Sequence, residues 1–238
     1  MSEQNINRWA VAAAVGGATI LLASALAGLG SRWGWWHFST GFDILRWAAY
    51  ACFLVVLLAL FALTRRRGWP LALFGLIAAL VVLANGWLMM RKARSVPAIH
   101  DITTDTNNPP AFVAVLPLRA DAPNSAAYEG AEIAAQQKEA YPDVVPLRLP
   151  IPAQQAFARA LDEAEDMGWT IVQAAPAEGR IEATARTFWF GFKDDVVVRI
   201  TPADGGSIVD VRSVSRVGRG DVGANAARIR EYLDELRD

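Results

Sequence analysis

Three long apolar runs near the start of the chain limit its fold more than any other feature. They extend from Trp9 to Gly30, from Leu45 to Leu63 and from Leu71 to Met90, and Arg46 is the one charged residue within them. A helix of about 20 residues crosses the hydrocarbon core of a bilayer, where an open backbone cannot satisfy its hydrogen bonds. The sequence therefore predicts three transmembrane helices at about 9–30, 45–63 and 71–90, in a membrane domain formed by residues 1–95.

The predicted spans have the composition of an anchor. Glu3 and Arg8 precede the first run and two more runs follow it, which does not match a cleaved signal peptide. No Asp, Glu, Lys or His lies in the middle of a span, whereas transporters and proton relays normally carry such groups there. The lipid bilayer is thus the first partner expected for this chain.

Basic residues close to the span ends predict the orientation of the helices. Arg8 and the triplet Arg65–Arg67 favour a cytoplasmic N-terminus, whereas the residues that oppose it are Arg32, Arg46, Arg91, Lys92 and Arg94. The triplet is the densest basic cluster in a short loop. We therefore expect the N-terminus inside and the C-terminal domain outside.

The remaining residues, 96–238, are expected to form one soluble domain with an acidic charge balance. They contain 14 Lys and Arg against 22 Asp and Glu. An acidic domain is repelled by phosphate backbones, so nucleic acid is not an expected partner. Cys52 is the only cysteine, it lies in the second apolar run, and the chain has two histidines. We therefore expect no metal site and no cofactor.

Hydrophobic spacing in this domain predicts an α+β fold. Phe157, Leu161, Ala164 and Met167 repeat at helical spacing before Gly168. Four strands are expected next and then a helix, at 170–174, 180–190, 195–201, 207–216 and 221–237. Short turns between the strands favour an antiparallel four-stranded sheet flanked by helices, in the order α-β-β-β-β-α. Residues 97–150 have an irregular pattern, with one helix near 126–140, and we expect them to wrap around this core.

Strand alternation gathers charged side chains on one face of the predicted sheet. Glu182, Thr184 and Arg186 share a side of one strand, and charged residues of the next two strands share it. One interpretation is a polar groove for an anionic or zwitterionic ligand, and its expected ligand-binding residues are Arg186, Arg199, Arg212, Arg216 and Arg219. The alternative is a set of ordinary cross-strand ion pairs.

Four aromatic residues follow one another closely in the run Thr187–Phe192. Alternation sends some of them to each face of the sheet, so Phe188 or Phe190 is expected to be exposed. An exposed aromatic side chain here would form a wedge for lipid headgroups or for a hydrophobic ligand. Alternatively, the wrapping segment 98–149 covers this face.

The run Gly218–Gly223 fits the pattern G-x-G-x-x-G between a strand and a helix. No parallel strand follows it, so a dinucleotide site is not expected. Free amides at the helix N-terminus, beside Arg216 and Arg219, could hold one phosphate or carboxylate. The competing interpretation is a turn in which Asp221 caps the helix.

His100 is the only histidine of the domain and precedes two carboxylates. A hydrolase or lyase could use it as a base, and the candidate catalytic residues are His100, Asp101, Asp105, Asp194 and Asp195. Turn chemistry before Pro109 is the plainer account of this run. The chain has no nucleophile elbow, His-Glu-x-x-His motif or Walker loop. Catalysis stays open, and a non-catalytic role is favoured.

Several short motifs occur in an order that resembles a bacterial and plastid-associated family, the domain of unknown function DUF1499. They are His100–Asp105, Pro109–Phe112, Tyr141–Asp143, Ile181–Thr187, Gly191–Val197, Val209–Ser213, Ser215–Gly218 and Asn225–Ile229. The resemblance extends over about 97–238 and excludes the three apolar runs. It implies an envelope-associated or lumenal setting, and it brings no activity, cofactor or catalytic residue.

Together these features predict a multi-pass protein of the cell inner (plasma) membrane with a periplasmic domain. We expect a non-catalytic domain that binds a protein partner or a small anionic or lipid ligand. One alternative is the hydrolase or lyase built on His100. Another is a lipid-contacting accessory or assembly factor of a membrane complex.

Overall fold

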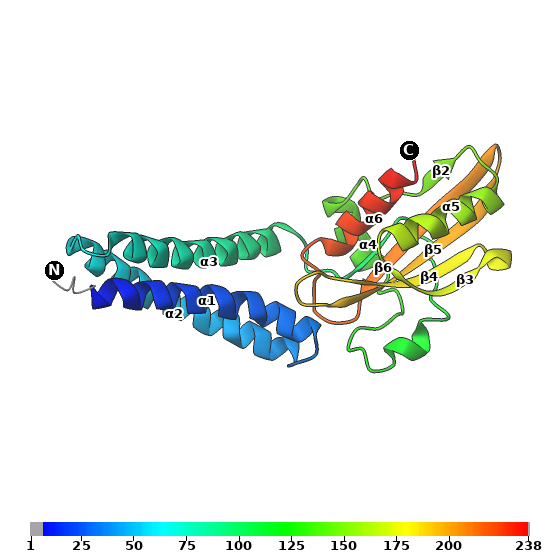
Figure 1. Ribbon diagram of the computed structural model, residues 1–238. Coiled ribbons are helices and arrows are strands. Elements are labelled where there is room, and N and C mark those ends of the chain that lie inside the picture. Colours follow the sequence, from blue (N-terminus) through cyan, green and yellow to red (C-terminus); the bar gives the residue numbers. More distant parts are fainter. Residues whose placement is uncertain (1–6, 238) are drawn as a thin grey trace. The chain divides into compact units, whose positions relative to one another are not determined.

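The computed structural model describes residues 7–237, which divide into two compact units (Figure 1). The helical unit comprises the residues up to Lys92 together with Phe188–Gly191, and the α+β unit comprises Ala93–Thr187 and the residues from Phe192 onward. The four residues Phe188–Gly191 are therefore separated in sequence from the helices with which they pack.

Three helices form the helical unit: α1 (Arg8–Arg32), α2 (Phe38–Thr64) and α3 (Trp69–Ser95). Each is long and apolar enough to cross a membrane. They extend a little beyond the apolar runs because the backbone remains helical through the polar residues at their ends. A Cβ on Gly75 would lie 2.4 Å from the carbonyl oxygen of Ala13. Glycine at this position therefore lets α3 approach α1 closely.

Residues 188–191 pack against α1. The Nε1 atom of Trp189 donates a hydrogen bond to the carbonyl oxygen of Ala25 over 3.1 Å. A Cβ on Gly28 would lie 2.4 Å from the same indole ring, so only glycine leaves room for it. Phe188 is 82% exposed and Phe190 is buried. One aromatic side chain of the run is thus exposed as expected, but the predicted strand 180–190 ends at Arg186 and the run forms a turn, so strand alternation is not the cause.

The α+β unit contains a six-stranded antiparallel sheet rather than one of four strands. Its strands are β1 (Asp101–Thr103), β2 (Leu147–Leu149), β3 (Thr170–Ala175), β4 (Arg180–Arg186), β5 (Lys193–Ala203) and β6 (Gly206–Ser215). The order is β1-β6-β5-β4-β3, and β2 also pairs with β6. The predicted strands are β3 to β6. The other two are three residues long, too short to show an alternating pattern.

Helices cover one face of this sheet. They are α4 (Ala131–Ala140), α5 (Ala153–Asp166) and α6 (Ala224–Glu235), and α5 and α6 lie side by side over the strands (Figure 1). Their apolar stripes meet the inward residues of β4, β5 and β6 in the main hydrophobic core. The α+β fold predicted from the sequence is confirmed. The helix expected near 126–140 begins at Ala131.

The opposite face of the sheet is covered by residues 105–128, called the covering segment below. This segment includes the 3-10 helix η1 (Leu116–Arg119), while a second one, η2 (Pro176–Glu178), joins β3 to β4. Phe112 and Val115 pack on Val197 and Val214 in a second, smaller core. The irregular segment therefore packs on this face of the sheet. The charged face predicted by alternation is an internal layer.

Candidate functional site

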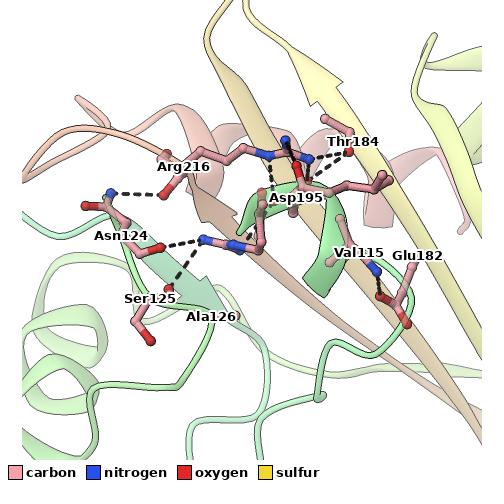
Figure 2. A network of polar contacts seen from close by, with 12 residues as sticks. Val115, Asn124, Ser125, Ala126, Glu182, Thr184, Asp195 and Arg216 are labelled. Atoms are coloured by element: carbon pink, nitrogen blue, oxygen red, sulfur yellow. Dashed lines mark hydrogen bonds and ion pairs between the residues drawn. The ribbon is translucent and has the colours of Figure 1, made fainter. Parts of the chain in front are cut away.

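Glu182 lies at one side of this internal polar layer and is fully buried. Its carboxylate accepts hydrogen bonds from the backbone amides of Val113, Ala114 and Val115, at 2.9 to 3.1 Å. Arg180 supplies the counter-charge. Figure 2 shows Glu182 facing Val115. Three successive amides around one carboxylate hold the covering segment against β4, and they satisfy a charge that burial would otherwise make costly.

A second cluster centres on Asp195, whose side chain is also fully buried. Arg216 donates to both of its oxygens, at 2.9 and 2.8 Å, and Thr184 donates to one of them at 2.8 Å. Figure 2 shows these three residues pointing toward one another. Arg119 approaches the same carboxylate from η1, with NH1 at 3.3 Å. The covering segment therefore brings a second guanidinium to an acid that already has a bidentate partner.

A third cluster joins β1 to β6. Arg212 donates to both carboxylate oxygens of Asp101, at 2.9 and 2.7 Å, and both side chains are almost fully buried. It also donates to the carbonyl oxygens of Pro110 and Ala126. Burial raises the pKa of the Asp101 carboxyl, although the hydrogen bonds and the charge of Arg212 oppose this. Further along the sheet, Arg199 bridges the two carboxylates of Asp105 and Asp210.

The structure separates the five arginines expected to bind a ligand. Arg199, Arg212 and Arg216 lie together beneath the covering segment, each paired with an acid. Arg186 and Arg219 are exposed. Ligand binding by the first three stays a prediction, and it would require access through the covering segment.

The candidate catalytic residues do not form one constellation. Strand alternation sends Asp194 toward α6 and Asp195 toward the covering segment, so these neighbours lie on opposite faces of the sheet. The ion pairs are Asp101–Arg212, Asp105–Arg199, Asp194–Arg228 and Asp195–Arg216. His100 Nε2 lies 3.7 Å from Glu129 Oε1, a partner that the sequence did not indicate. Within residues 7–237, no group of three or more His, Cys, Asp or Glu is placed to hold a metal ion.

The N-terminus of α6 is occupied by a side chain of the protein. Asp221 accepts hydrogen bonds from the amides of Gly223 and Asn225, at 2.8 and 2.7 Å. Burial raises the pKa of this carboxyl, and the two backbone hydrogen bonds oppose that effect. The glycine-rich run is therefore a turn whose Asp221 side chain binds an amide in the first turn of the helix, but the N-cap residue is Gly223 and not Asp221 as predicted. The backbone amides that could have held a phosphate or carboxylate ligand already donate to Asp221.

A cleft of about 300 Å³ opens on the helical face of the sheet, between α5, β4 and α6. Its lining residues are Met167, Gly168, Trp169, Ala185, Arg186, Ala224, Ala227, Arg228 and Glu231. Sequence reasoning singled out Arg186 but missed the contributions of Trp169, Arg228 and Glu231. The two alanines one turn apart at the start of α6 were the available signal. Small residues at helical spacing mark close packing just as often, so that signal was ambiguous.

Comparison with known proteins identifies a family but no characterised relative. The family described as "Protein of unknown function (DUF1499)" matches residues 101–236. The match begins at β1 and ends after α6, so it includes the polar layer and the cleft and excludes most of the helical unit. No curated protein matches the chain.

Proposed function

The chain belongs to the DUF1499 family of proteins of unknown function, and we propose that it is a membrane-anchored, non-catalytic protein of the cell envelope that binds a small anionic or zwitterionic ligand. The observation that carries this proposal is the cleft beside α6. Concave sites with an apolar lining and a few convergent polar groups are where small molecules bind. The cleft is concave and has such polar groups in Arg186, Arg228 and Glu231, although its exposed lining is more polar than apolar.

The polar groups of the cleft are held in place before any ligand arrives. Arg228 donates to Asp194 at 2.6 Å and to Ser213 at 2.9 Å, which fixes its guanidinium beside β6. Arg186 and Glu231 also line the cleft and add one positive and one negative charge to it. Side chains already ordered lose less entropy on binding. A ligand with an apolar part and an anionic or zwitterionic head matches this lining.

A non-catalytic role is supported by how the acids of the domain are used. A general base must reach its substrate proton and must be available to accept it. Each of the four candidate aspartates forms an ion pair with an arginine of the protein. Their carboxylates are engaged in holding strands and segments together.

Filling the cleft should abolish ligand retention. The variant Ala227→Trp places an indole in the cleft, and Ala135→Trp, on the exposed side of α4, is the matched control. We expect native mass spectrometry of the full-length protein, purified in detergent, to detect a bound small molecule in the wild type and the control but not in Ala227→Trp. The same bound mass in all three proteins, or none in the wild type, would refute the proposal.

The proposed location is the inner membrane with the α+β unit in the periplasm. The side chain of Asn7 donates to the carbonyl oxygens of Ala62 and Arg67, which ties the start of α1 to the turn between α2 and α3. Arg8 and the arginine triplet therefore gather at one end of the helical unit, as the positive-inside rule favours for the cytoplasmic side. Three spans would then bring the chain out on the opposite side.

A reporter fused after the last residue tests this location. We expect alkaline phosphatase fused there to be active in a bacterial host and green fluorescent protein fused there to be dark, because only the first folds in the periplasm. A reporter fused at the N-terminus serves as the control and should give the reverse pattern. Fluorescence from the C-terminal fusion would place the domain in the cytoplasm.

A second candidate function, a lipid-contacting accessory factor, is favoured by one observation. Phe188 is 82% exposed, and the guanidinium of Arg32 lies 5.9 Å from its ring centre. Trp33 and Trp35, in the turn after α1, are exposed as well. Aromatic and arginine side chains together are typical of the headgroup region of a bilayer. This group would contact lipid beside a membrane complex.

A further inference from the structure

The polar layer contains a buried cation whose hydrogen-bonding capacity is largely unused. Arg119 is only 5% exposed. Its NH2 donates to the carbonyl oxygens of Asn124 and Ser125, at 3.1 and 3.4 Å. Its Nε and NH1 atoms have no hydrogen-bond partner, although NH1 lies 3.3 Å from Asp195. Buried donors in native proteins nearly always have an acceptor, so these two nitrogens mark the place of a missing one.

The charge around Arg119 is also unbalanced. The charges that act on it most strongly are those of Asp195, Arg216, Arg212 and Asp101. Both aspartates already accept two hydrogen bonds from the other arginines. Around Arg119, three guanidinium groups therefore share two carboxylates, whereas further along the layer Arg199 alone faces two. Because arginine stays protonated in proteins, this local excess of positive charge remains beside Arg119.

Burial and the neighbouring arginines act on this side chain in the same direction. Burial lowers the pKa of Arg119, and the positive charges of Arg216 and Arg212 lower it further, whereas Asp195 and Asp101 raise it. A buried charge without full compensation is costly. A neutral water molecule would accept hydrogen bonds from the unused nitrogens but would leave the excess charge. A bound anion would accept hydrogen bonds from these nitrogens and would also compensate the charge.

From these observations we infer that a small monovalent anion of the halide class binds at Nε and NH1 of Arg119, between η1 and strands β5 and β6. The buried Phe112 ring lies 5.7 Å from the Arg119 guanidinium carbon, and Val115 beside it is fully buried. Such surroundings favour an ion of one atom over a phosphate or an organic acid. The bound ion would lock the covering segment onto the sheet. This site is separate from the cleft beside α6 and does not depend on the ligand proposed there.

Chloride-dependent thermal stability tests the inference. The full-length protein in a neutral detergent is heated in sodium chloride and in sodium gluconate of equal ionic strength. We expect chloride to raise the melting temperature by about 2 to 4 °C, and the rise to saturate, because an ion that binds only the folded state stabilises it by mass action. Bromide, which binds similar sites, should act likewise. No specific rise in chloride would overturn the inference.

Two variants and one direct measurement complete the test. Arg119→Met removes both the excess charge and the unused donors, so its melting temperature should not respond to chloride. Arg148→Met, at an exposed arginine of β2, should respond as the wild type does. Anomalous scattering from wild-type crystals grown in sodium bromide should give a peak within hydrogen-bonding distance of Arg119, and this decides the matter if Arg119→Met fails to fold. An equal chloride response in Arg119→Met, or no peak at Arg119, would contradict the site.

Discussion

Replacing Asp101 with asparagine is expected to destabilise the protein by about 3 to 5 kcal/mol, because it leaves a buried guanidinium without its counter-charge. Arg212 is 3% exposed, and its two hydrogen bonds to a charged acceptor go to Asp101. The carboxamide offers a single acceptor and no charge. Thermal or denaturant unfolding of the detergent-solubilised protein measures the loss.

The matched control is Asp143→Asn. Asp143 also accepts two hydrogen bonds from one arginine, Arg230, but its side chain is 55% exposed. Water screens that pair and solvates the arginine when the partner is removed, so a loss below about 1 kcal/mol is expected. Similar losses at the two positions would mean that burial does not decide the strength of these pairs.

The effect of Asp101→Asn should depend on pH in a definite direction. Burial raises the pKa of Asp101 above its ordinary value of 3.8, so the folded protein takes up a proton at a higher pH than the unfolded chain does. The wild type therefore loses stability from this group as the pH rises through the raised pKa. The variant has no titratable group at this position, so its stability does not change through this range. The stability difference should therefore grow as the pH falls from neutral through the raised pKa toward the ordinary value.

Replacing Glu182 with glutamine is expected to cost about 2 to 4 kcal/mol and to loosen the covering segment. The carboxylate accepts hydrogen bonds from three consecutive amides and faces Arg180. Glutamine keeps the shape but loses the charge, and its NH2 group points a donor at other donors. Hydrogen exchange measured by mass spectrometry should show faster exchange of the amides of residues 113–115.

Glu178→Gln provides the control for Glu182. It removes the other acid that pairs with Arg180, but that side chain is 62% exposed. We expect a change below about 1 kcal/mol and no change in exchange at residues 113–115. Unaltered exchange in Glu182→Gln would show that the smaller apolar core around Phe112 holds the segment without this carboxylate.

Local patterns predicted the elements of this fold well. Uninterrupted apolar composition identified α1, α2 and α3, since a helix that can cross a membrane is recognised by length and polarity alone. Period-two alternation identified β3 to β6, and it placed Glu182, Thr184 and Arg212 on one face, as the strand register confirms. The binding of Asp221 to an amide in the first turn of α6 was also readable, although the N-cap residue is Gly223. Each of these features depends on residues close together in the chain.

The candidate sites were less predictable because they depend on pairing between distant segments. The sequence showed that Arg212 and Glu182 share a face, but Asp101 reaches Arg212 from 111 residues away. The cleft beside α6 arises where α5, β4 and α6 meet, and no single run contains its lining. Residues 188–191 likewise pack on α1, where Gly28 leaves room for the indole ring of Trp189. The sequence alone does not indicate this role of the glycine.

By itself, the sequence determined the three apolar helices, the α+β class, the meander of long strands and the charged face of the sheet. Only the tertiary structure decided that this face is closed by residues 105–128, that its acids pair with arginines, and that two nitrogens of Arg119 have no hydrogen-bond partner. The physical reason is that periodicity records which side of an element a residue occupies. What lies against that side is set by long-range packing, and burial and charge compensation follow from that packing.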